Sequence, residues 1–319
     1  MNRRCLIPVL LVIFLFGCTS PPPEETLQDP NVTPEGVRIT PDVVYRHKYG
    51  MALTFDMFQP ENQNGAGVIL INSNTWLSIN PNFYKQTTEG FRLMTDEELA
   101  SKETGWRRNL IKPLIDKGIT VFEVRHESSP GAKMSEIVAD LRRAVSFIRF
   151  HSGDYGVDPE RFGLWDASAA GHLALLLATT ADIPNQNATE EFETSTGRVA
   201  TVVAEAPPTD LQRLVEPYLM NTDMLKQIPV LTMNEDQYRE YSPLYFASSD
   251  DPPTLIIHGD QDKLVPIIEG ESMFQALQKA GVESKFVIIP GAGHGFEGED
   301  ADHASTEAIS WLEEHLAKK

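Results

Sequence analysis

The chain has 319 residues, of which 41% are hydrophobic and 23% are charged, a composition typical of a globular protein with one large core. Its formal net charge of −19 at pH 7 repels nucleic acid and anionic membrane surfaces, so neither is expected as a partner. Acidity alone decides neither the fold nor the reaction, which must come from the order of elements and motifs.

The N-terminus carries an export pattern. The basic stretch Asn2–Arg4 precedes an apolar run over 6–16, which is too short for a stable membrane span but suits the core of a signal peptide. The run ends in Leu-Phe-Gly-Cys at 15–18, which resembles the cleavage box of bacterial lipoproteins. We therefore expect residues 1–17 to be a lipoprotein-type signal peptide, with a plain secretory signal or a short uncleaved anchor as the alternative.

The lipoprotein resemblance implies that Cys18 becomes the lipidated first residue of an exported protein. Several acyl chains make such an attachment stable where a single chain is marginal. The protein would then sit at the periplasmic or cell-surface face of a bacterial membrane. Cys5 would leave with the signal, and the folded body would have no cysteine for disulfide or thiol chemistry. Residues 18–36, rich in Pro, Glu and Thr, are predicted to be a tether.

Residues 37–319 are predicted to form a single domain that opens with strands. The stretches 43–50 and 52–60 alternate apolar and polar residues around a turn at Tyr49-Gly50, which predicts an antiparallel pair. The next strands are continuous apolar runs rich in β-branched residues, as in strands buried on both faces. These runs cover 67–71, 119–124, 161–165, 199–205, 253–259 and 285–291.

Helical stretches lie between these runs. Over 134–151, apolar residues recur at three- and four-residue spacing and form one stripe, and 270–281 and 301–319 behave similarly. The alternation predicts an α/β fold with a doubly wound, mostly parallel sheet and flanking helices. Segments 72–108 and 211–241 interrupt the alternation, and each is either an irregular cover over the carboxyl ends of the strands or surface decoration.

Three polar side chains follow predicted buried strands at the sheet edge where ligands gather in open α/β sheets. In chain order they are Ser168, Asp262 and His294, with Asp260 as a rival for the acid. A serine, an acid and a histidine in this order is the arrangement of α/β-hydrolases. For each side chain, a merely structural role in a tight corner or a loop is the alternative.

The motifs around these residues resemble the α/β-hydrolase family, on its esterase and prolyl-oligopeptidase-like side. The resemblance rests on "DYGVDPERFGLWDASAAGHLALLLAT", "SPLYFASSDDPPTLIIHGDQDKLVP" and "PGAGHGF", which stand in the family's order. It implies the α/β-hydrolase fold and a triad in which Ser168 is the nucleophile and His294 the base. Asp262 is favoured over Asp260 as the acid that orients the base, because the family's acid stands two residues before the Val-Pro pair. A serine hydroxyl needs such a base to become a nucleophile, and the carboxylate fixes the tautomer of the histidine.

The sequence departs from the family pattern Gly-x-Ser-x-Gly around the serine, where Asp166 and Ala170 replace the two glycines. Alanine is a mild change, but Asp166 brings a charge near the position of the oxyanion. An ionised carboxylate about 7 Å away, at an effective dielectric constant near 20, would cost roughly 2 kcal/mol, or about thirtyfold in rate. Such a charge would slow an enzyme without abolishing its activity.

A second departure lies in the loop after strand 67–71. The family commonly has His-Gly-Gly-Gly-Trp there, and this chain has Asn-Ser-Asn-Thr-Trp at 72–76. Asparagine tolerates left-handed backbone geometry, and its amide can itself donate to an oxyanion. We therefore expect Ser73, Asn74 and the backbone N–H of Ala169 to form the oxyanion hole. Losing one such donor costs ~10²–10³ in rate, so this loop matters more than Asp166.

The function predicted from these residues is hydrolysis of small-molecule carboxylic esters through an acyl-enzyme intermediate, on a protein held at the membrane by its lipid anchor. No metal site and no cofactor are expected, and the acidic cluster Glu297, Glu299, Asp300 and Asp302 is interpreted as a solvated loop. His172 is interpreted as a packing residue, and His126 is left without a role. An aminopeptidase or oligopeptidase, and a degenerate hydrolase that serves as a binding lipoprotein, remain as alternatives.

Overall fold

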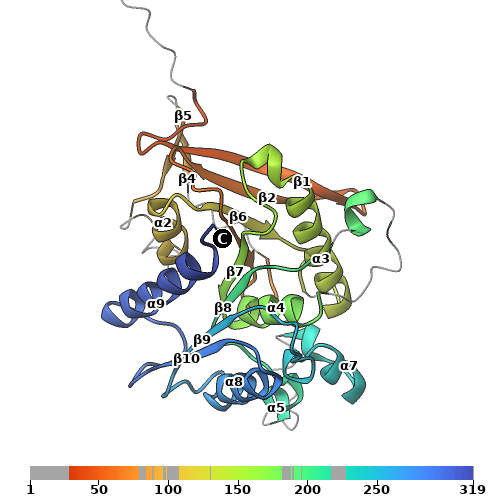
Figure 1. Ribbon diagram of the computed structural model, residues 1–319. Helices are drawn as coiled ribbons and strands as arrows, with labels where there is room; N and C mark the ends of the chain where they lie inside the picture. The colour runs from red at the N-terminus through yellow and green to blue at the C-terminus, as the bar shows by residue number, and fades with distance from the viewer. Residues whose placement is uncertain are drawn as a thin grey trace, which may run out of the picture.

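A single eight-stranded sheet organises the molecule, in the order β1-β2-β6-β3-β7-β8-β9-β10 (Figure 1). The computed structural model describes residues 29–78, 84–87, 90–95, 98, 108–129, 131–181, 188, 190–194, 196–216 and 228–318. The strands are β1 Val37–Lys48, β2 Met51–Pro60, β3 Gly67–Asn72, β6 Thr120–Arg125, β7 Phe162–Ala167, β8 Thr201–Glu205, β9 Thr254–Gly259 and β10 Ser284–Ile289.

The sheet is antiparallel at its opening edge and parallel elsewhere. β1 pairs with β2, and β2 with β6, in antiparallel register, while all the remaining neighbours run parallel. The turn between β1 and β2 places Tyr49 and Gly50 at φ values of 51° and 80°, which the glycine tolerates without steric cost. All six residues of β3 are buried, as expected for a strand covered on both faces. The predicted antiparallel pair and parallel sheet are therefore confirmed.

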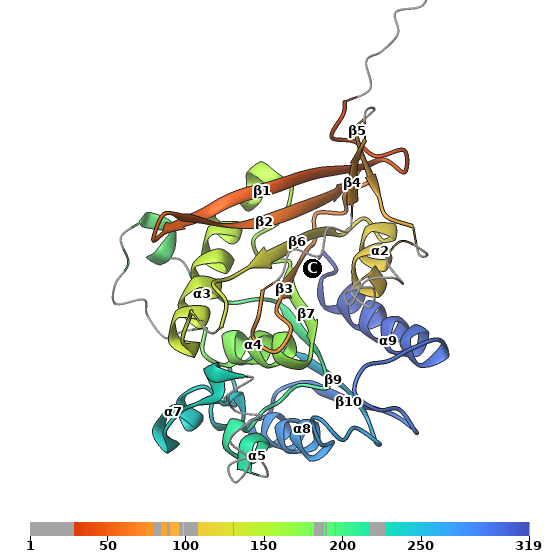
Figure 2. The same cartoon turned by 180° about the vertical axis from the view of Figure 1, so that it is seen from behind.

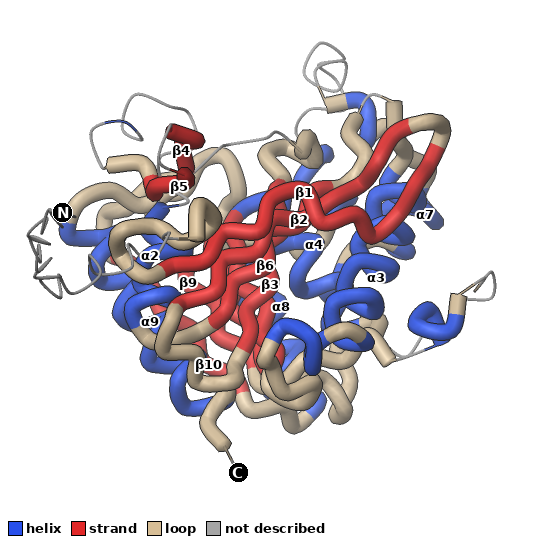
Figure 3. The backbone as a smooth tube through the Cα atoms, turned by 90° about the horizontal axis from the view of Figure 1, so that it is seen from above, coloured by secondary structure: helices blue, strands red, loops and turns tan. Residues whose placement is uncertain are grey.

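Helices cover both faces of this sheet (Figures 2 and 3). One face carries α3 Met134–Phe150, α4 Ser168–Thr179 and α8 Ile268–Ala280. The other face carries α2 Arg108–Asp116 and α9 Glu299–His315. Two layers of helices on a mostly parallel sheet make the doubly wound α/β architecture that the alternation predicts.

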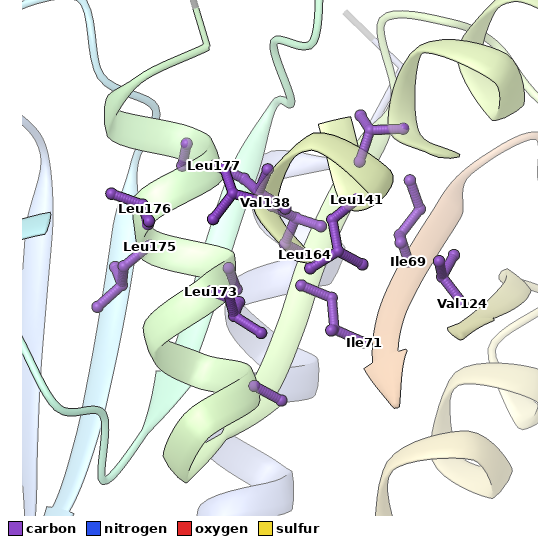
Figure 4. Close-up of a cluster of buried hydrophobic side chains, with 14 of the residues drawn as sticks. Ile69, Ile71, Val124, Val138, Leu141, Leu164, Leu173, Leu175, Leu176 and Leu177 are labelled. Carbon is purple, nitrogen blue, oxygen red and sulfur yellow. The ribbon is translucent and has the colours of Figure 1, made fainter. Parts of the chain in front are cut away.

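The core on the α3–α4 face shows how the apolar stripes of the helices are used. Leu141 of α3 and Leu173 of α4 are at most 1% exposed and pack with Leu164 of β7 (Figure 4). Complete burial of a leucine side chain contributes about 1.5–3 kcal/mol. This packing fixes α4 against β7, and so fixes the corner that joins them.

The segments that interrupt the alternation are short elements where the structure describes them. In the first, β4 Tyr84–Thr87 pairs with β5 Gly90–Leu93. The second holds α5 Leu211–Val215 and α7 Glu235–Glu240. The remaining elements are the 3₁₀ helices η2 Ser152–Tyr155, η3 Glu191–Thr194, η5 Pro229–Leu231 and η6 Pro243–Tyr245.

The folded part of the chain begins earlier than predicted. Residues 29–36 fall within the predicted tether, yet Thr33 is 1% exposed, and the Ile39 N–H donates to the Asn31 carbonyl at 2.8 Å. These residues lie along β1 and do not form a free tether. The predicted signal peptide and Cys18 lie outside the described residues. Within the described ranges, no helix is both long enough and apolar enough to cross a bilayer.

Candidate active site

β7 ends at Ala167 and α4 begins at Ser168, so the corner between these two elements holds Ser168 at the carboxyl end of β7. Ser168 has a φ of 55°, a left-handed conformation that costs a non-glycine residue roughly 1–2 kcal/mol. Such strain persists only where the surrounding structure enforces it, and a strained strand-to-helix turn is how α/β-hydrolases expose their nucleophile. Gly171 allows the close approach, because a Cβ there would lie 3.0 Å from the Asp166 carbonyl oxygen.

The three side chains predicted from the chain order meet in one relay. His294 Nε2 lies 2.9 Å from Ser168 Oγ, and His294 Nδ1 lies 2.7 Å from Asp262 Oδ2. A carboxylate only accepts hydrogen bonds, so Nδ1 carries the proton and Nε2 is left to accept from the hydroxyl. That is the tautomer a general base needs.

Asp262 is held as an ionised, fixed acceptor. Its Oδ1 accepts the backbone N–H groups of Leu264 and Val265, both at 2.9 Å. Burial raises its pKa, but hydrogen bonds from His258 and His294 and from the Val265 N–H outweigh burial and hold the pKa well below its usual range. The carboxylate is therefore charged at neutral pH.

The rival acid, Asp260, points elsewhere. It is exposed, and its Oδ1 accepts the backbone N–H of Gly291 at 2.7 Å, which shapes the turn that follows β10. The structure thus brings Asp262, and not Asp260, to His294.

Two hollows open on either side of Ser168. The larger measures about 300 Å³ and contains His294, Glu205, Trp165 and Asn74 among its lining residues. The smaller measures about 50 Å³ and is apolar, lined by Trp76 and Ala169 and by side chains of the segment that contains α5 and η5: Leu214, Val215, Ile228 and Leu231. The described residues of segment 211–241 therefore belong to a cover over the site, which is one of the two predicted alternatives.

The loop after β3 already uses one of the donors predicted for the oxyanion hole. The Asn74 N–H donates to the Leu77 carbonyl at 2.8 Å, so this backbone donor is already engaged. Ser73 is buried and is not among the lining residues of either hollow in the described part of the chain. The exposed Asn74 side chain does line the larger hollow, and Ala169, whose first-turn N–H has no partner within the helix, lines the smaller one.

A tight turn explains why Asn74 loses its N–H. Asn74 and Leu77 pair reciprocally, with Thr75 and Trp76 between them at φ values of 47° and 58°. Both central residues of such a two-residue turn need positive φ, which glycine or asparagine adopts far more easily than threonine or tryptophan. The loop therefore has left-handed geometry at Thr75 and Trp76, although it lacks the glycines of the family pattern.

His172 holds that turn in place. Its Nδ1 accepts the Trp76 indole N–H at 3.2 Å, and its Nε2–H donates to the Tyr241 carbonyl at 2.7 Å. Burial lowers the pKa of His172 to about 4, so the ring is neutral and can accept and donate at once. The predicted packing role of His172 agrees with these contacts. His126 is buried, with Nδ1 2.6 Å from the Glu127 carbonyl oxygen, and is not among the residues that line the two hollows.

Asp166 has a structural role that the sequence does not predict. It is fully buried, and its Oδ2 accepts the Ile71 N–H at 2.6 Å while Oδ1 accepts the Ala167 N–H at 3.0 Å. The carboxylate therefore joins β3 to β7 beyond Ile69 and Leu164, the last residues that pair between these strands. Asp166 is not among the residues that line the larger hollow, so any effect of its charge on the reacting oxygen acts through space, and the predicted repulsion stays a prediction.

Glu205 is the functional candidate that sequence reasoning missed. It ends β8, pairs in register with Ala167, and receives the Trp165 indole N–H on Oε1 at 2.7 Å. Burial raises the pKa of Glu205 to about 7, and the negative charge of Asp166 adds to this increase. The hydrogen bond from Trp165 lowers the pKa but does not outweigh burial. The available signal was its place as the last residue of a predicted strand, at the edge where Ser168 also lies.

The acidic cluster is not gathered around a site. Glu297 is exposed at the larger hollow, and Glu299, Asp300 and Asp302 form the first turn of α9, where negative charge complements the helix dipole. Across the described ranges, no group of three or more His, Cys, Asp or Glu side chains is arranged to hold a metal ion.

Several curated proteins that are similar in sequence are named as esterases. "Probable carboxylic ester hydrolase LipM" of Mycobacterium tuberculosis is 27% identical over 67% of this chain and 51% of its own length. "Esterase LipQ" of the same organism is 26% identical over 59% of this chain and 45% of its own length. The chain thus spans about half the length of the curated relatives it matches.

Solved structures with the same fold carry similar names. A truncated carbohydrate esterase from gut microbiota superposes with a TM-score of 0.68 at 20% identity, covering 90% of this chain and all of that one. Native esterase 2 of Thermogutta terrifontis superposes with a TM-score of 0.66 at 22% identity, covering 89% of this chain and 95% of its own. At these identities the likeness shows the α/β-hydrolase fold.

Two family models match overlapping parts of the chain. Residues 241–315 match the dienelactone hydrolase family, and residues 96–277, more than half of the chain, match the model named BD-FAE. The sheet order and the strained serine corner agree with these matches. The chain is therefore a member of the BD-FAE family and has the α/β-hydrolase fold.

Proposed function

We propose that this protein is a serine hydrolase that cleaves carboxylic esters of small molecules through an acyl-enzyme. The observation that carries the proposal is the relay from Asp262 through His294 to Ser168, at 2.7 and 2.9 Å, with a hollow on each side of the serine. The esterase names of the relatives support the same chemistry.

The relay sets the order of steps. Ser168 Oγ attacks the ester carbonyl carbon, and its proton passes to His294 Nε2. The tetrahedral intermediate collapses as its bond to the alcohol oxygen breaks, and His294 returns the proton to that oxygen. Water then repeats the sequence on the acyl-enzyme: its proton goes to His294, the carboxylic acid leaves, and Ser168 regains its hydrogen. Asp262 stabilises the imidazolium in each half-reaction.

The oxyanion needs hydrogen-bond donors other than the backbone N–H of Asn74, which already donates to Leu77. The first-turn N–H of Ala169 points out of α4 beside Ser168, and helix N-termini favour negative charge. The Asn74 carboxamide, at the edge of the larger hollow, is the second donor in this proposal. A side-chain amide in place of a glycine backbone N–H has precedent in serine hydrolases of other folds.

Steady-state hydrolysis of p-nitrophenyl acetate and butyrate tests the proposal. Ser168→Ala is expected to lower kcat by at least about 10³-fold, because truncating the nucleophile of a triad removes most of the rate enhancement. Ser305→Ala, which changes another serine of the same hollow, is the matched control and should stay within severalfold of the unmodified protein.

Two outcomes would favour the alternative functions. Hydrolysis of aminoacyl p-nitroanilides faster than of esters would make the protein a peptidase. An absence of Ser168-dependent turnover on either substrate class would instead favour a binding protein built on a degenerate hydrolase.

We also propose that the protein is exported and held at a bacterial membrane by lipid on Cys18. The support is the basic start, the apolar run and the Leu-Phe-Gly-Cys box of the first 18 residues.

A further inference from the structure

The larger hollow contains a buried carboxyl group that the ester mechanism does not use. Glu205 is 8% exposed, and the one hydrogen bond of its side chain within the described part of the chain comes from Trp165 Nε1 to Oε1. The residue lines the hollow, and Oε2 is not among the buried side-chain atoms that lack a partner in the described residues. Oε2 is therefore accessible and can accept a hydrogen bond from a molecule that occupies the hollow.

The position of His294 decides which half of an ester reaches Glu205. The base must hand its proton to the oxygen of the departing alcohol, so the alcohol lies on the side of Ser168 where His294 stands. His294 lines the larger hollow and is absent from the lining of the smaller, apolar one. The alcohol thus extends into the larger hollow toward Glu205, and a short acyl group occupies the smaller hollow.

The charges around the larger hollow all have one sign. Glu297 stands exposed at it, and the buried Asp166 lies on the strand next to Glu205. Among the described residues that line the hollow there is no lysine or arginine, and His294 is occupied by the relay. These carboxylates would repel an alcohol that carries negative charge, whereas a hydroxyl or ammonium group would find an acceptor in Oε2.

We propose that Glu205 is a specificity-determining residue for the leaving alcohol. It selects esters whose alcohol carries a hydrogen-bond donor, hydroxyl or ammonium, and it discriminates against esters whose alcohol carries negative charge. This inference rests on the proposed ester hydrolysis and adds to it the chemistry of one substrate half. The discrimination against an anion about 5 Å from Glu205, at an effective dielectric constant near 20, is on the order of a hundredfold.

The test is run at pH 8.5, above the pKa of Glu205, so that this carboxyl group is ionised. It uses four acetate esters of one size: benzyl acetates whose para substituent is methyl, hydroxymethyl, aminomethyl or carboxylate. The unmodified protein should rank them by kcat/KM with aminomethyl and hydroxymethyl first, methyl next and carboxylate last. Glu205→Gln, nearly identical in shape but uncharged, should remove at least tenfold of the penalty on the carboxylate and abolish the preference for aminomethyl. The matched control is Glu299→Gln, an exposed glutamate outside the hollow, which should keep the original ranking.

The proposal is overturned if Glu205→Gln leaves the ranking of the four esters intact. This includes the case in which all four kcat/KM values change by one common factor, as a purely structural role would cause. The four free alcohols, titrated calorimetrically into Ser168→Ala and into its Glu205→Gln double variant, give the same ranking without turnover. A failure of ester hydrolysis is thereby distinguished from a failure of the charge selection.

Discussion

Asp166 and Ser168 show how far single residues can be interpreted from their place in a motif. The serine, histidine and aspartate of the relay could be predicted because each follows a strand with an apolar sequence, and parallel strands bring such positions to one edge. The strands before Ser168 and Asp262 are buried, whereas β10, before His294, is a partly exposed edge strand. Asp166 could not be interpreted in the same way. Its effect depends on whether the carboxylate faces the reacting atoms or the backbone of β3, a strand 95 residues away along the chain.

Replacing Asp166 by alanine should therefore destabilise the fold more than it accelerates the reaction. The Ile71 and Ala167 N–H groups lose a buried acceptor, which costs about 1–3 kcal/mol in the free energy of unfolding. Urea denaturation measures this loss. Asp154→Ala, whose side chain is 78% exposed, should change the same quantity by less than about 0.5 kcal/mol. Unchanged stability with a reaction about thirtyfold faster would instead support the interpretation of Asp166 as a repulsive charge.

Glu205→Gln should stabilise the protein in a pH-dependent way. The pKa of Glu205 is raised from 4.5 to about 7 in the fold, so the folded state holds this proton more tightly than the unfolded state does. The resulting stability is complete below pH 4.5 and is lost as the pH rises through 7. Glutamine does not titrate, so its advantage over glutamate should grow between pH 5 and 8 and approach about 3 kcal/mol.

Melting temperatures of both proteins at pH 5, 6, 7 and 8 measure that difference. Three other titratable residues lie near Glu205 or line the same hollow: Asp166, Glu297 and His294. Both proteins contain them, so the comparison isolates the effect of Glu205. A constant offset between the two melting curves across this range would contradict a raised pKa.

At the scale of elements, the strands and main helices follow from apolar pattern, and the loops that make the site do not. The helix predicted at 134–151 is found at Met134–Phe150, and the helix predicted to close at Gly281 ends there, with Gly281 at a φ of 83°. The turn at 74–77 has no such pattern. It takes left-handed geometry without glycine because Trp76, His172 and Tyr241 hold it through contacts between residues that are distant in the sequence.

His172→Phe tests whether this contact positions the loop. Phenylalanine keeps most of the volume but removes both hydrogen bonds, leaving the Trp76 indole N–H and the Tyr241 carbonyl without their buried partner. We expect kcat for p-nitrophenyl acetate to fall by at least tenfold with KM changed much less, as for an interaction made in the transition state. Leu177→Ala, a buried change elsewhere on α4, should cost about 2–5 kcal/mol of stability while leaving kcat within severalfold. Equal effects of the two substitutions on kcat would refute a specific role for His172.

At the scale of the whole molecule, the order of strands and helices was sufficient to predict the fold class and the residues of the relay. The hollows were beyond prediction, because their walls come from α2, α9 and the segment of α5 and η5, whose mutual packing leaves no periodic signal. The boundary of the folded part was also misjudged. Residues 29–36 have the composition of a tether, yet their backbone bonds to β1.

The proposed membrane attachment is tested by fractionating cells that express the full chain. Cys18→Ser should move the protein from the membrane pellet to the soluble fraction, because the acceptor of the lipid is lost. Cys5→Ser changes the other cysteine of the chain, within the predicted signal, and should leave the protein in the pellet. A Cys18→Ser protein that still sediments with membranes would exclude Cys18 as the anchor.

The most direct measurement of the central claim is the site at which a fluorophosphonate reacts with the protein. These reagents are attacked only by a serine whose proton is taken up by a neighbouring base, which is what the 2.9 Å contact between His294 and Ser168 provides. Intact mass followed by peptide mapping should show one adduct per chain, on Ser168, and none in Ser168→Ala or His294→Ala. Modification of a different residue, or no modification of the unmodified protein, would contradict the account.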